Sequence, residues 1–168
     1  MESFRRFYQQ YRESFFAYLV RFTGDCDLAG EIMQESFTRY LERYGHRLPE
    51  PRLLYTIGRN AALDAFRHKR RLVLVDEETP DSEGDQEQRL VVKQTYQRMQ
   101  RALMKLPPGE RDVLTLVVSG DLNYREIGAM IGISEANVKV RVHRARVKLK
   151  HLMEKEHDDG RTHQHVYR

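Results

Sequence analysis

Apolar side chains recur at intervals of three and four residues along most of this chain, and this spacing limits its possible folds more than any other feature. The aromatic residues near the N-terminus show the spacing most clearly, at Phe4, Phe7, Tyr11, Phe15 and Phe22. Side chains three or four positions apart share one face of an α-helix, whereas a strand needs alternation of period two. The sequence contains neither strand alternation nor an internal repeat. We therefore predict an all-α protein.

Glycine and proline residues divide this helical pattern into segments. Gly24 ends the first helix, and the segment 44–51, with one Gly and two Pro, predicts a loop. Pro107 halts a later helix, and Pro108 suits the first turn of the next one. The predicted helices are 4–22, 27–43, 53–71, 90–106, 108–119, 124–131 and 135–150.

The net charge of +4 is unevenly distributed along the 168 residues. Residues 1–75 and 90–168 are basic, whereas residues 76–89 hold seven acidic side chains and one basic one. The acidic segment also contains Pro, Gly and Ser and almost nothing to bury, as is typical of a flexible linker. Two basic parts favour polyanionic partners. We predict one domain over 1–75, the linker over 76–89, a second domain over 90–153 and a disordered tail over 154–168.

Residues 123–150 have the pattern of a helix-turn-helix. Asn123 and Glu126 have the spacing of a capping box, Gly132 breaks the short helix that they begin, and Ser134 caps the next helix. Two helices joined by a short turn containing Gly are typical of a DNA-binding motif. The second helix has an apolar seam, which we expect to pack on residues 108–131. The seam consists of Val138, Val142, Ala145 and Leu149.

The remaining faces of this second helix are basic, with no acidic residue from Lys139 to Lys150. Asn pairs well with adenine, and Arg or Lys with guanine, in a major groove. A solvated amphipathic helix is the alternative for the charges alone, but the capped helix and the Gly turn favour DNA binding. The residues expected at DNA are Ala136, Asn137, Lys139, Val140, Arg141, His143, Arg144 and Arg146. We expect the later Lys148 and Lys150 to meet phosphates or solvent.

Three stretches resemble bacterial extracytoplasmic-function sigma factors. Residues 106–149, LPPGERDVLTLVVSGDLNYREIGAMIGISEANVKVRVHRARVKL, closely resemble the fourth conserved region of that family. Residues 27–44, DLAGEIMQESFTRYLERY, resemble its polymerase-gripping helix, and residues 53–71, LLYTIGRNAALDAFRHKRR, resemble its promoter-melting helix. The order of these stretches and the acidic linker also fit. The resemblance implies a promoter-specificity subunit of RNA polymerase, not an enzyme, with no cofactor.

The resemblance also implies the partners of each domain. The first domain, called sigma-2 in the family, binds the coiled coil of the largest polymerase subunit. The second, sigma-4, reads the minus-thirty-five element and docks on the flap of the second-largest subunit. The implied polymerase contacts are Asp27, Glu31, Ile32, Gln34, Glu35 and Phe37, with Ile32 and Phe37 divided between core packing and contact. Gly30 stands where an acidic residue is common in the family.

In this family the loop before the basic helix captures a base flipped out of the minus-ten strand, and here that loop is 45–51. Extruding a base costs a few kcal/mol, which pocket contacts and phosphate attraction recover. The implied minus-ten residues are His46, Arg47, Tyr55, Arg59, Asn60, Arg67, Lys69, Arg70 and Arg71. For Tyr55 both stacking on a base and packing in the core stay open.

A stand-alone helix-turn-helix regulator is the alternative to a sigma factor. An enzyme is disfavoured, because the sequence has no acidic cluster with metal spacing, no phosphate-binding Gly loop and no catalytic triad pattern. The single Cys26 excludes an internal disulfide, and the histidines near the C-terminus do not make a convincing metal site. No apolar run has the ~20 residues of a membrane span. We expect a cytoplasmic protein at the nucleoid. The resemblance also implies control by an anti-sigma factor, which in the family is often membrane-bound and could hold the protein at the membrane.

Overall fold

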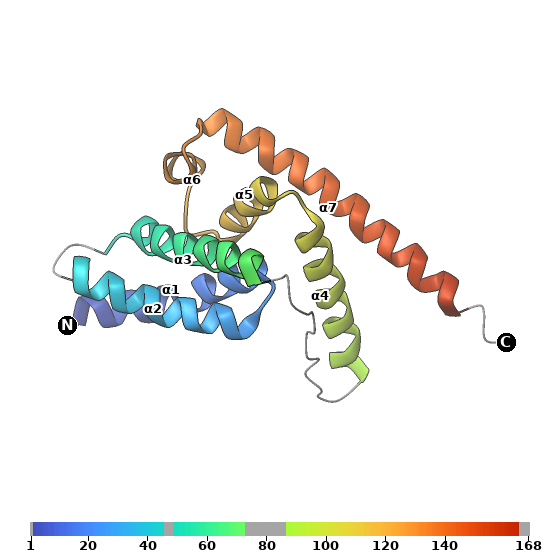
Figure 1. The fold of residues 1–168 in the computed structure, drawn as a ribbon, viewed down its shortest axis with the longest axis horizontal. Coiled ribbons are helices and arrows are strands. Elements are labelled where there is room, and N and C mark those ends of the chain that lie inside the picture. Colours follow the sequence, from blue (N-terminus) through green and yellow to red (C-terminus); the bar gives the residue numbers. More distant parts are fainter. Residues whose placement is uncertain (1, 46–48, 73–86, 165–168) are drawn as a thin grey trace.

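The structure, a computed structural model, describes residues 2–45, 49–72 and 87–164. Within these ranges the chain forms α-helices and no strand, so the predicted all-α fold is confirmed. Figure 1 shows α1–α3 gathered in one bundle, with α5 between that bundle and the long α7. The helices are α1 (Glu2–Thr23), α2 (Cys26–Tyr44), α3 (Pro51–Leu72), α4 (Glu87–Lys105), α5 (Pro108–Ser119), α6 (Tyr124–Ile131) and α7 (Glu135–Gln164). We call α1–α3 the N-terminal lobe and α4–α7 the C-terminal lobe.

An aromatic core holds the N-terminal lobe together. The rings of Phe7 and Tyr40 stack with centroids 4.8 Å apart, and Phe15 meets Tyr55 edge-on at 5.1 Å. Aromatic pairs favour these two geometries and gain about 0.5–1.5 kcal/mol beyond the burial of their area. The aromatic face predicted for the first helix is confirmed, because Phe7, Phe15, Tyr18, Leu19 and Phe22 are all buried.

The turn between α1 and α2 follows from two adjacent residues. Gly24 has a φ of 74°, a left-handed conformation that ends α1 and that side chains other than glycine rarely adopt. The Asp25 side chain then accepts a hydrogen bond from the Leu28 N–H at 3.0 Å. Because Asp25 is this N-cap, α2 begins at Cys26, one residue earlier than predicted. The Cys26 thiol is free and exposed.

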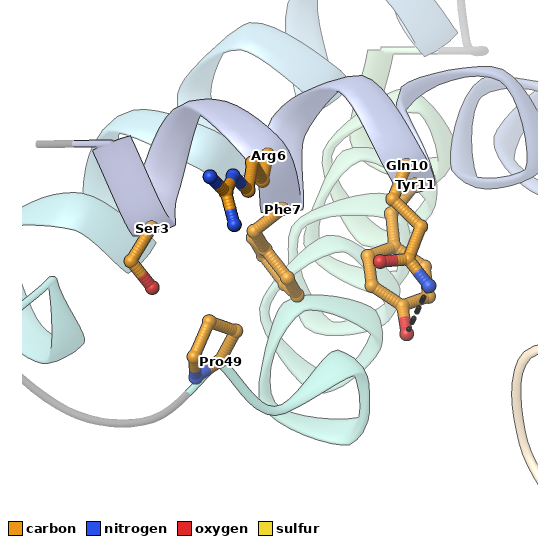
Figure 2. A pocket seen from close by; sticks show the side chains of 6 residues that line it. All are labelled: Ser3, Arg6, Phe7, Gln10, Tyr11 and Pro49. Carbon is orange, nitrogen blue, oxygen red and sulfur yellow. Dashed lines mark hydrogen bonds between the residues drawn. The ribbon is translucent and has the colours of Figure 1, made fainter.

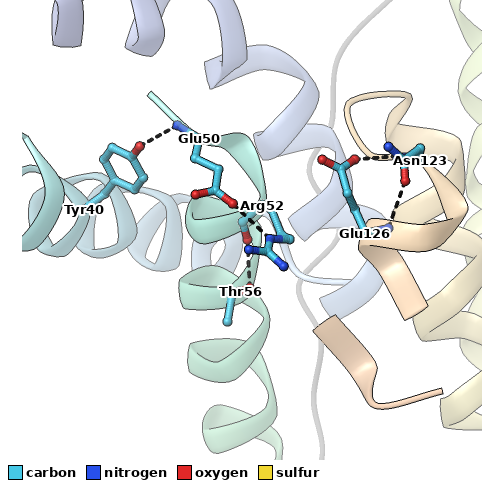
Figure 3. A network of polar contacts seen from close by, with 6 residues as sticks. All are labelled: Tyr40, Glu50, Arg52, Thr56, Asn123 and Glu126. Carbon is cyan, nitrogen blue, oxygen red and sulfur yellow. Dashed lines mark hydrogen bonds and ion pairs between the residues drawn. The ribbon is translucent and has the colours of Figure 1, made fainter. Parts of the chain in front are cut away.

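The predicted helix-turn-helix is confirmed in the C-terminal lobe. The backbone N–H of Asn123 donates to Oε2 of Glu126 at 2.8 Å, and the N–H of Glu126 donates to Oδ1 of Asn123 at 2.9 Å (Figure 3). Gly132, with a φ of 77°, ends α6. Ser134 Oγ accepts a hydrogen bond from the Asn137 N–H at 3.2 Å and thereby caps α7. These local bonds fix the angle at which α7 leaves α6.

The apolar seam of α7 packs as predicted on the other helices of its lobe. Val138, Val142 and Ala145 are buried, and Leu149 is partly buried. Helices α4, α5 and α6 all pack against α7. The burial of this seam turns the opposite faces of α7 towards solvent.

The C-terminal end of α7 differs from the prediction. The predicted helix ends at residue 150, whereas α7 continues to Gln164, and residues 165–168 lie outside the described part. The disordered tail expected over 154–168 stays a prediction. Once a helix is nucleated, each further residue adds one backbone hydrogen bond, and the sequence after Met153 begins with the good helix formers Glu154 and Lys155.

The two lobes pack directly against each other. Helix α1 contacts α4 and α5, and α3 contacts α6. One continuous buried cluster includes Phe15 and Tyr55 of the N-terminal lobe together with Val113, Leu116 and Ile127 of the C-terminal lobe. The predicted flexible linker falls largely on residues 73–86, outside the described residues, and stays a prediction. Across the described helices, none has the length and hydropathy needed to cross a membrane.

Candidate nucleic-acid interface

The front half of α7 presents its polar side chains to solvent. Of the residues predicted to read DNA, Ala136, Asn137, Lys139, Val140, His143, Arg144 and Arg146 are exposed. Arg141 is half-buried, and its guanidinium lies beside Gly109 at the start of α5. The seam residues Val138 and Val142 alternate with these side chains at helical spacing, so α7 is anchored on one side and open on the other.

Two lysines of α7 have acidic partners within the C-terminal lobe. Lys139 Nζ lies 3.2 Å from Glu135 Oε1, one helical turn away, and both side chains are well exposed. Lys148 Nζ lies 2.7 Å from Glu110 Oε1, and the Glu110 side chain is only 14% exposed. The pair with Glu110 ties the middle of α7 to the start of α5. We expected Lys148 to meet phosphate or solvent, and the structure gives it this partner in the lobe.

Helix α2 presents a polar face that contains four of the predicted polymerase contacts. Asp27, Glu31, Gln34 and Glu35 are exposed, and Glu35 pairs with Arg39 at 2.5 Å.

The two apolar members of the predicted polymerase set lie elsewhere. Ile32 and Phe37 are each 4% exposed, and the Phe37 ring packs edge-on against Phe15 with centroids 5.7 Å apart. We predicted that these two residues would be divided between the core and the polymerase contact. The structure corrects this, because the burial of both on the inner face of α2 leaves neither available at the surface.

The predicted minus-ten residues fall into three groups. The first group is four residues whose side chains are not described: His46 and Arg47 lie outside the described residues, and Arg70 and Arg71 belong to the last turn of α3. The second group lies on the exposed side of α3. Asn60, Arg67 and Lys69 are exposed along α3, where Arg67 forms a 3.0 Å ion pair with Asp64.

The third group, Tyr55 and Arg59, faces the C-terminal lobe. Tyr55 is fully buried, and its hydroxyl donates to Asp121 Oδ2 at 2.6 Å. Burial, and after it the hydrogen bond to Asp121, raise the pKa of the Tyr55 phenol well above its ordinary value. Two roles were left open for Tyr55, packing in the core and stacking on a base. In this structure the Tyr55 ring packs in the core, where it cannot stack on a base.

Arg59 forms an ion pair across the lobes. Its Nε and Nη2 atoms donate to the two carboxylate oxygens of Asp112 at 2.7–3.1 Å. Burial acts to lower the pKa of the guanidinium, but the hydrogen bonds and the charge of Asp112 outweigh it, so the pKa is raised. Arg59 therefore stays charged. Its guanidinium, which we predicted to bind a DNA phosphate, binds the carboxylate of Asp112 in this structure.

An open pocket lies beside the end of the predicted base-capturing loop. It has a volume of about 450 Å³ and is lined by Ser3, Arg6, Phe7, Gln10 and Tyr11 of α1 and by Pro49 (Figure 2). The Gln10 side chain donates to the Tyr11 hydroxyl at 3.2 Å. Sequence reasoning missed this pocket, because the polar positions of α1 have the pattern of an ordinary solvated helix face. Among the described residues no cluster of His, Cys, Asp or Glu is arranged to hold a metal ion.

Comparison with known proteins supports one family. Residues 96–149 match the family model described as sigma-70, region 4. The chain is 33% identical over 154 residues to the ECF RNA polymerase sigma factor SigM of Bacillus subtilis, covering 86% of this chain and 91% of that one. It is 31% identical to the ECF RNA polymerase sigma factor EcfG of Rhodopseudomonas palustris, covering 82% and 77% of the two chains.

A solved structure has the same fold over nearly the whole chain. It is the sigma factor RpoE of Bartonella quintana in complex with the anti-sigma factor NepR, with a TM-score of 0.74 and 21% identity. The match covers 92% of this chain and 98% of that one. The long match to SigM, the region 4 model and the helix-turn-helix with its exposed polar face lead to one assignment. The chain belongs to the extracytoplasmic-function family of RNA polymerase sigma factors.

Proposed function

We propose that this sigma factor divides the tasks of promoter-directed transcription initiation between its two lobes. The C-terminal lobe reads the minus-thirty-five element, and the N-terminal lobe binds core polymerase and reads and melts the minus-ten element. The observation that carries the proposal is the front of α7, where exposed Asn137, Lys139 and Arg144 stand on a helix whose opposite side is locked into a capped helix-turn-helix. Readout of base edges needs side chains held in this way.

Sequence choice belongs to the first three turns of α7. Asn137 and Arg144 have the side chains that pair in two-point fashion with adenine and guanine. Arg146 and Lys150 lie further along the helix and are exposed, so they suit the phosphate backbone. Lys148 instead pairs with Glu110 of its own lobe.

The exposed face of α2 suits the polymerase contact. Asp27, Glu31, Gln34 and Glu35 lie within nine residues on a helix whose inner face is fixed by Ile32 and Phe37. The coiled coil of the largest polymerase subunit is the proposed partner, with the flap of the second-largest subunit as the partner of the C-terminal lobe. Acidic side chains on a rigid helix steer and orient a basic partner surface.

The minus-ten strand is proposed to cross α3 and the pocket at Pro49. Exposed Asn60, Arg67 and Lys69 supply polar and cationic groups along α3. The pocket combines the buried Phe7 ring with Arg6, Gln10 and Tyr11, a combination that suits a flat base with hydrogen-bonding edges. An anti-sigma factor is a further proposed partner, supported by the NepR complex of the related fold.

The experiment that tests this function is in-vitro transcription with purified core polymerase over genomic promoters, followed by sequencing of the transcript starts. The expected result is specific initiation that depends on both the added protein and the core enzyme. A stand-alone regulator would instead bind a duplex site tightly without polymerase and would not support initiation. Absence of specific initiation would overturn the proposal.

A further inference from the structure

Val140 is an apolar residue on the solvent side of α7. The residues two positions before and after it, Val138 and Val142, are 0% and 2% exposed, whereas Val140 is 45% exposed. Residues two positions apart lie about 200° apart around a helix axis. Val140 therefore points away from the seam that anchors α7 on its lobe.

Polar side chains surround Val140 on this exposed face. Asn137 comes three positions before it and Arg144 four positions after it, and side chains at these spacings are neighbours on a helix surface. Both are exposed, as is His143 beside Arg144. Val140 thus lies in the middle of the face that is proposed to read the minus-thirty-five element.

Exposure alone does not distinguish this valine. Val118 of α5 and Val147 of α7 are 52% and 56% exposed, and single apolar residues at the surface are ordinary. Val147 lies two turns further along α7, in the part whose cations are proposed to bind phosphates. The distinguishing feature of Val140 is its place between two proposed base-reading side chains.

Only one feature of the base edges suits an apolar side chain. The major groove presents hydrogen-bond donors and acceptors on every base pair, and thymine adds the 5-methyl group. Against a G·C pair the valine would displace water from polar base edges and return no hydrogen bond. A β-branched side chain in a helix is also held in one main rotamer, so the Val140 methyl groups are already positioned for contact.

We propose that Val140 selects a thymine in the minus-thirty-five element by contact of its methyl groups with the thymine 5-methyl group. The proposal rests on the promoter-reading function described above and adds one base of the sequence that is read. Val140 lies about 4.5 Å from Asn137 along the helix axis, close to the ~3.4 Å between stacked base pairs. The thymine is therefore expected in the base pair next to the one that Asn137 reads, on either strand.

The first test uses a library of promoters with a randomised minus-thirty-five element, transcribed by core polymerase with the full-length protein. Wild type is expected to enrich thymine at one position, and Val140→Ala to lose the enrichment at that position alone. Val147→Ala is the matched control, because it makes the same change at an exposed valine of the same helix face. It is expected to keep the wild-type profile. A wild-type profile without a thymine preference, or the same profile for Val140→Ala, would overturn the proposal.

The second test removes the methyl group from the DNA. Deoxyuridine replaces thymidine at the selected position and keeps every donor and acceptor of the base. Wild-type holoenzyme is expected to bind the uracil promoter about fourfold more weakly, the factor that corresponds to one buried methyl-sized group. Val140→Ala is expected to bind the two promoters equally. A preference for the shape of A·T pairs would survive the replacement, so equal binding by wild type would contradict a methyl contact.

The wild-type comparison of thymine with uracil needs no variant, so it decides the proposal even if a substitution disturbs the fold. Val140→Ala is expected to fold, because the side chain is exposed and alanine is the better helix former; circular dichroism checks this. Specific initiation that is indifferent to the thymine methyl would overturn this inference and leave the proposed function standing. Absence of specific initiation by wild type would overturn the proposed function and the inference together.

Discussion

The hydroxyl of Tyr40, near the end of α2, accepts a hydrogen bond of 2.8 Å from the backbone N–H of Glu50, just before α3 (Figure 3). The bond links α2 to the residue just before α3, and these two positions flank the segment that is proposed to capture the minus-ten base. Glu50 also holds Arg52 by a 3.0 Å ion pair in the first turn of α3. A buried phenol therefore fixes the place where the loop ends and the basic helix begins.

Tyr40→Phe removes this bond and keeps the ring in the aromatic core. We expect a loss of about 0.5–1.5 kcal/mol in the free energy of unfolding, because the Glu50 N–H loses its partner. Urea denaturation followed by circular dichroism measures it. Tyr96→Phe, at an exposed tyrosine, is the control and is expected to change stability by less than about 0.5 kcal/mol. Equal effects of the two substitutions would show that the bond does not stabilise the fold.

Asn123→Ala removes the cap of α6. The helix has eight residues, so its first turn is a large part of it, and the substitution removes the Oδ1 that accepts from the Glu126 N–H while the backbone N–H of residue 123 keeps its acceptor on Glu126. We expect a loss of about 1 kcal/mol in the free energy of unfolding, measured by thermal or urea denaturation. An unchanged midpoint would mean that packing against α7 alone positions α6.

Arg144→Ala tests base readout by α7. Transcription from promoters with an intact minus-thirty-five element is expected to fall by the equivalent of about 1–3 kcal/mol for one lost base contact. The matched substitution Arg146→Ala is expected to weaken binding uniformly across sequences and to reduce its salt dependence by about one phosphate contact. Run-off transcription over promoter variants distinguishes the two. Identical sequence profiles for both variants would contradict the assignment of readout to the front of α7.

Glu31→Lys combined with Gln34→Lys tests the polymerase face of α2. Both side chains are exposed, so the fold is expected to stay intact while binding to core polymerase is lost. The charge-matched control is Gln9→Lys combined with Glu13→Lys, at exposed positions of α1. Co-purification with core polymerase and circular dichroism give the two readings. Loss of polymerase binding in both double variants would point to net charge in place of a specific face.

Alkaline pH is expected to destabilise the protein through its buried and partly buried phenols. Burial is the first cause that raises the pKa values of Tyr11, Tyr18, Tyr40 and Tyr55 above the ordinary value of 10.0. In the unfolded chain these phenols ionise first, so stability is constant below about pH 9 and falls as the pH rises past 10 towards the native pKa values. Phenolate absorbance measures the titration, which is clean because the chain has nine Tyr and no Trp. In denaturant all the phenols should titrate together near the ordinary value.

Features encoded by neighbouring residues were predictable from the sequence. The Asn123–Glu126 box, the Gly132 turn and the buried seam at Val138 and Val142 depend on spacings of three to eight residues. Helical periodicity also predicted a buried face for α2, but it could not decide how much of Ile32 or Phe37 reached the surface. Burial at that level depends on Phe15, which comes from another helix.

The contacts between the lobes had no local signal. Arg59 and Asp112 are 53 positions apart, with the acidic segment between them, and each has the sequence context of an ordinary helical charge. The composition of the acidic segment predicted a flexible connection, and such a composition sets only the freedom of the connection and not the affinity of the surfaces it joins. The fitted shapes of α1, α3 and α5 decide that affinity, and a single sequence does not display them.

The length of α7 makes it a lever. Its 30 residues extend for ~45 Å at 1.5 Å per residue, and Figure 1 shows the rod projecting past α4. A rotation of the C-terminal lobe by about 10° around the front of α7 moves the far end by ~8 Å at that length. A small adjustment where Asp112 meets Arg59 therefore becomes a large displacement near the C-terminus. By the same geometry, a force applied near the C-terminal end of α7 acts on the contact between the lobes through a long lever arm.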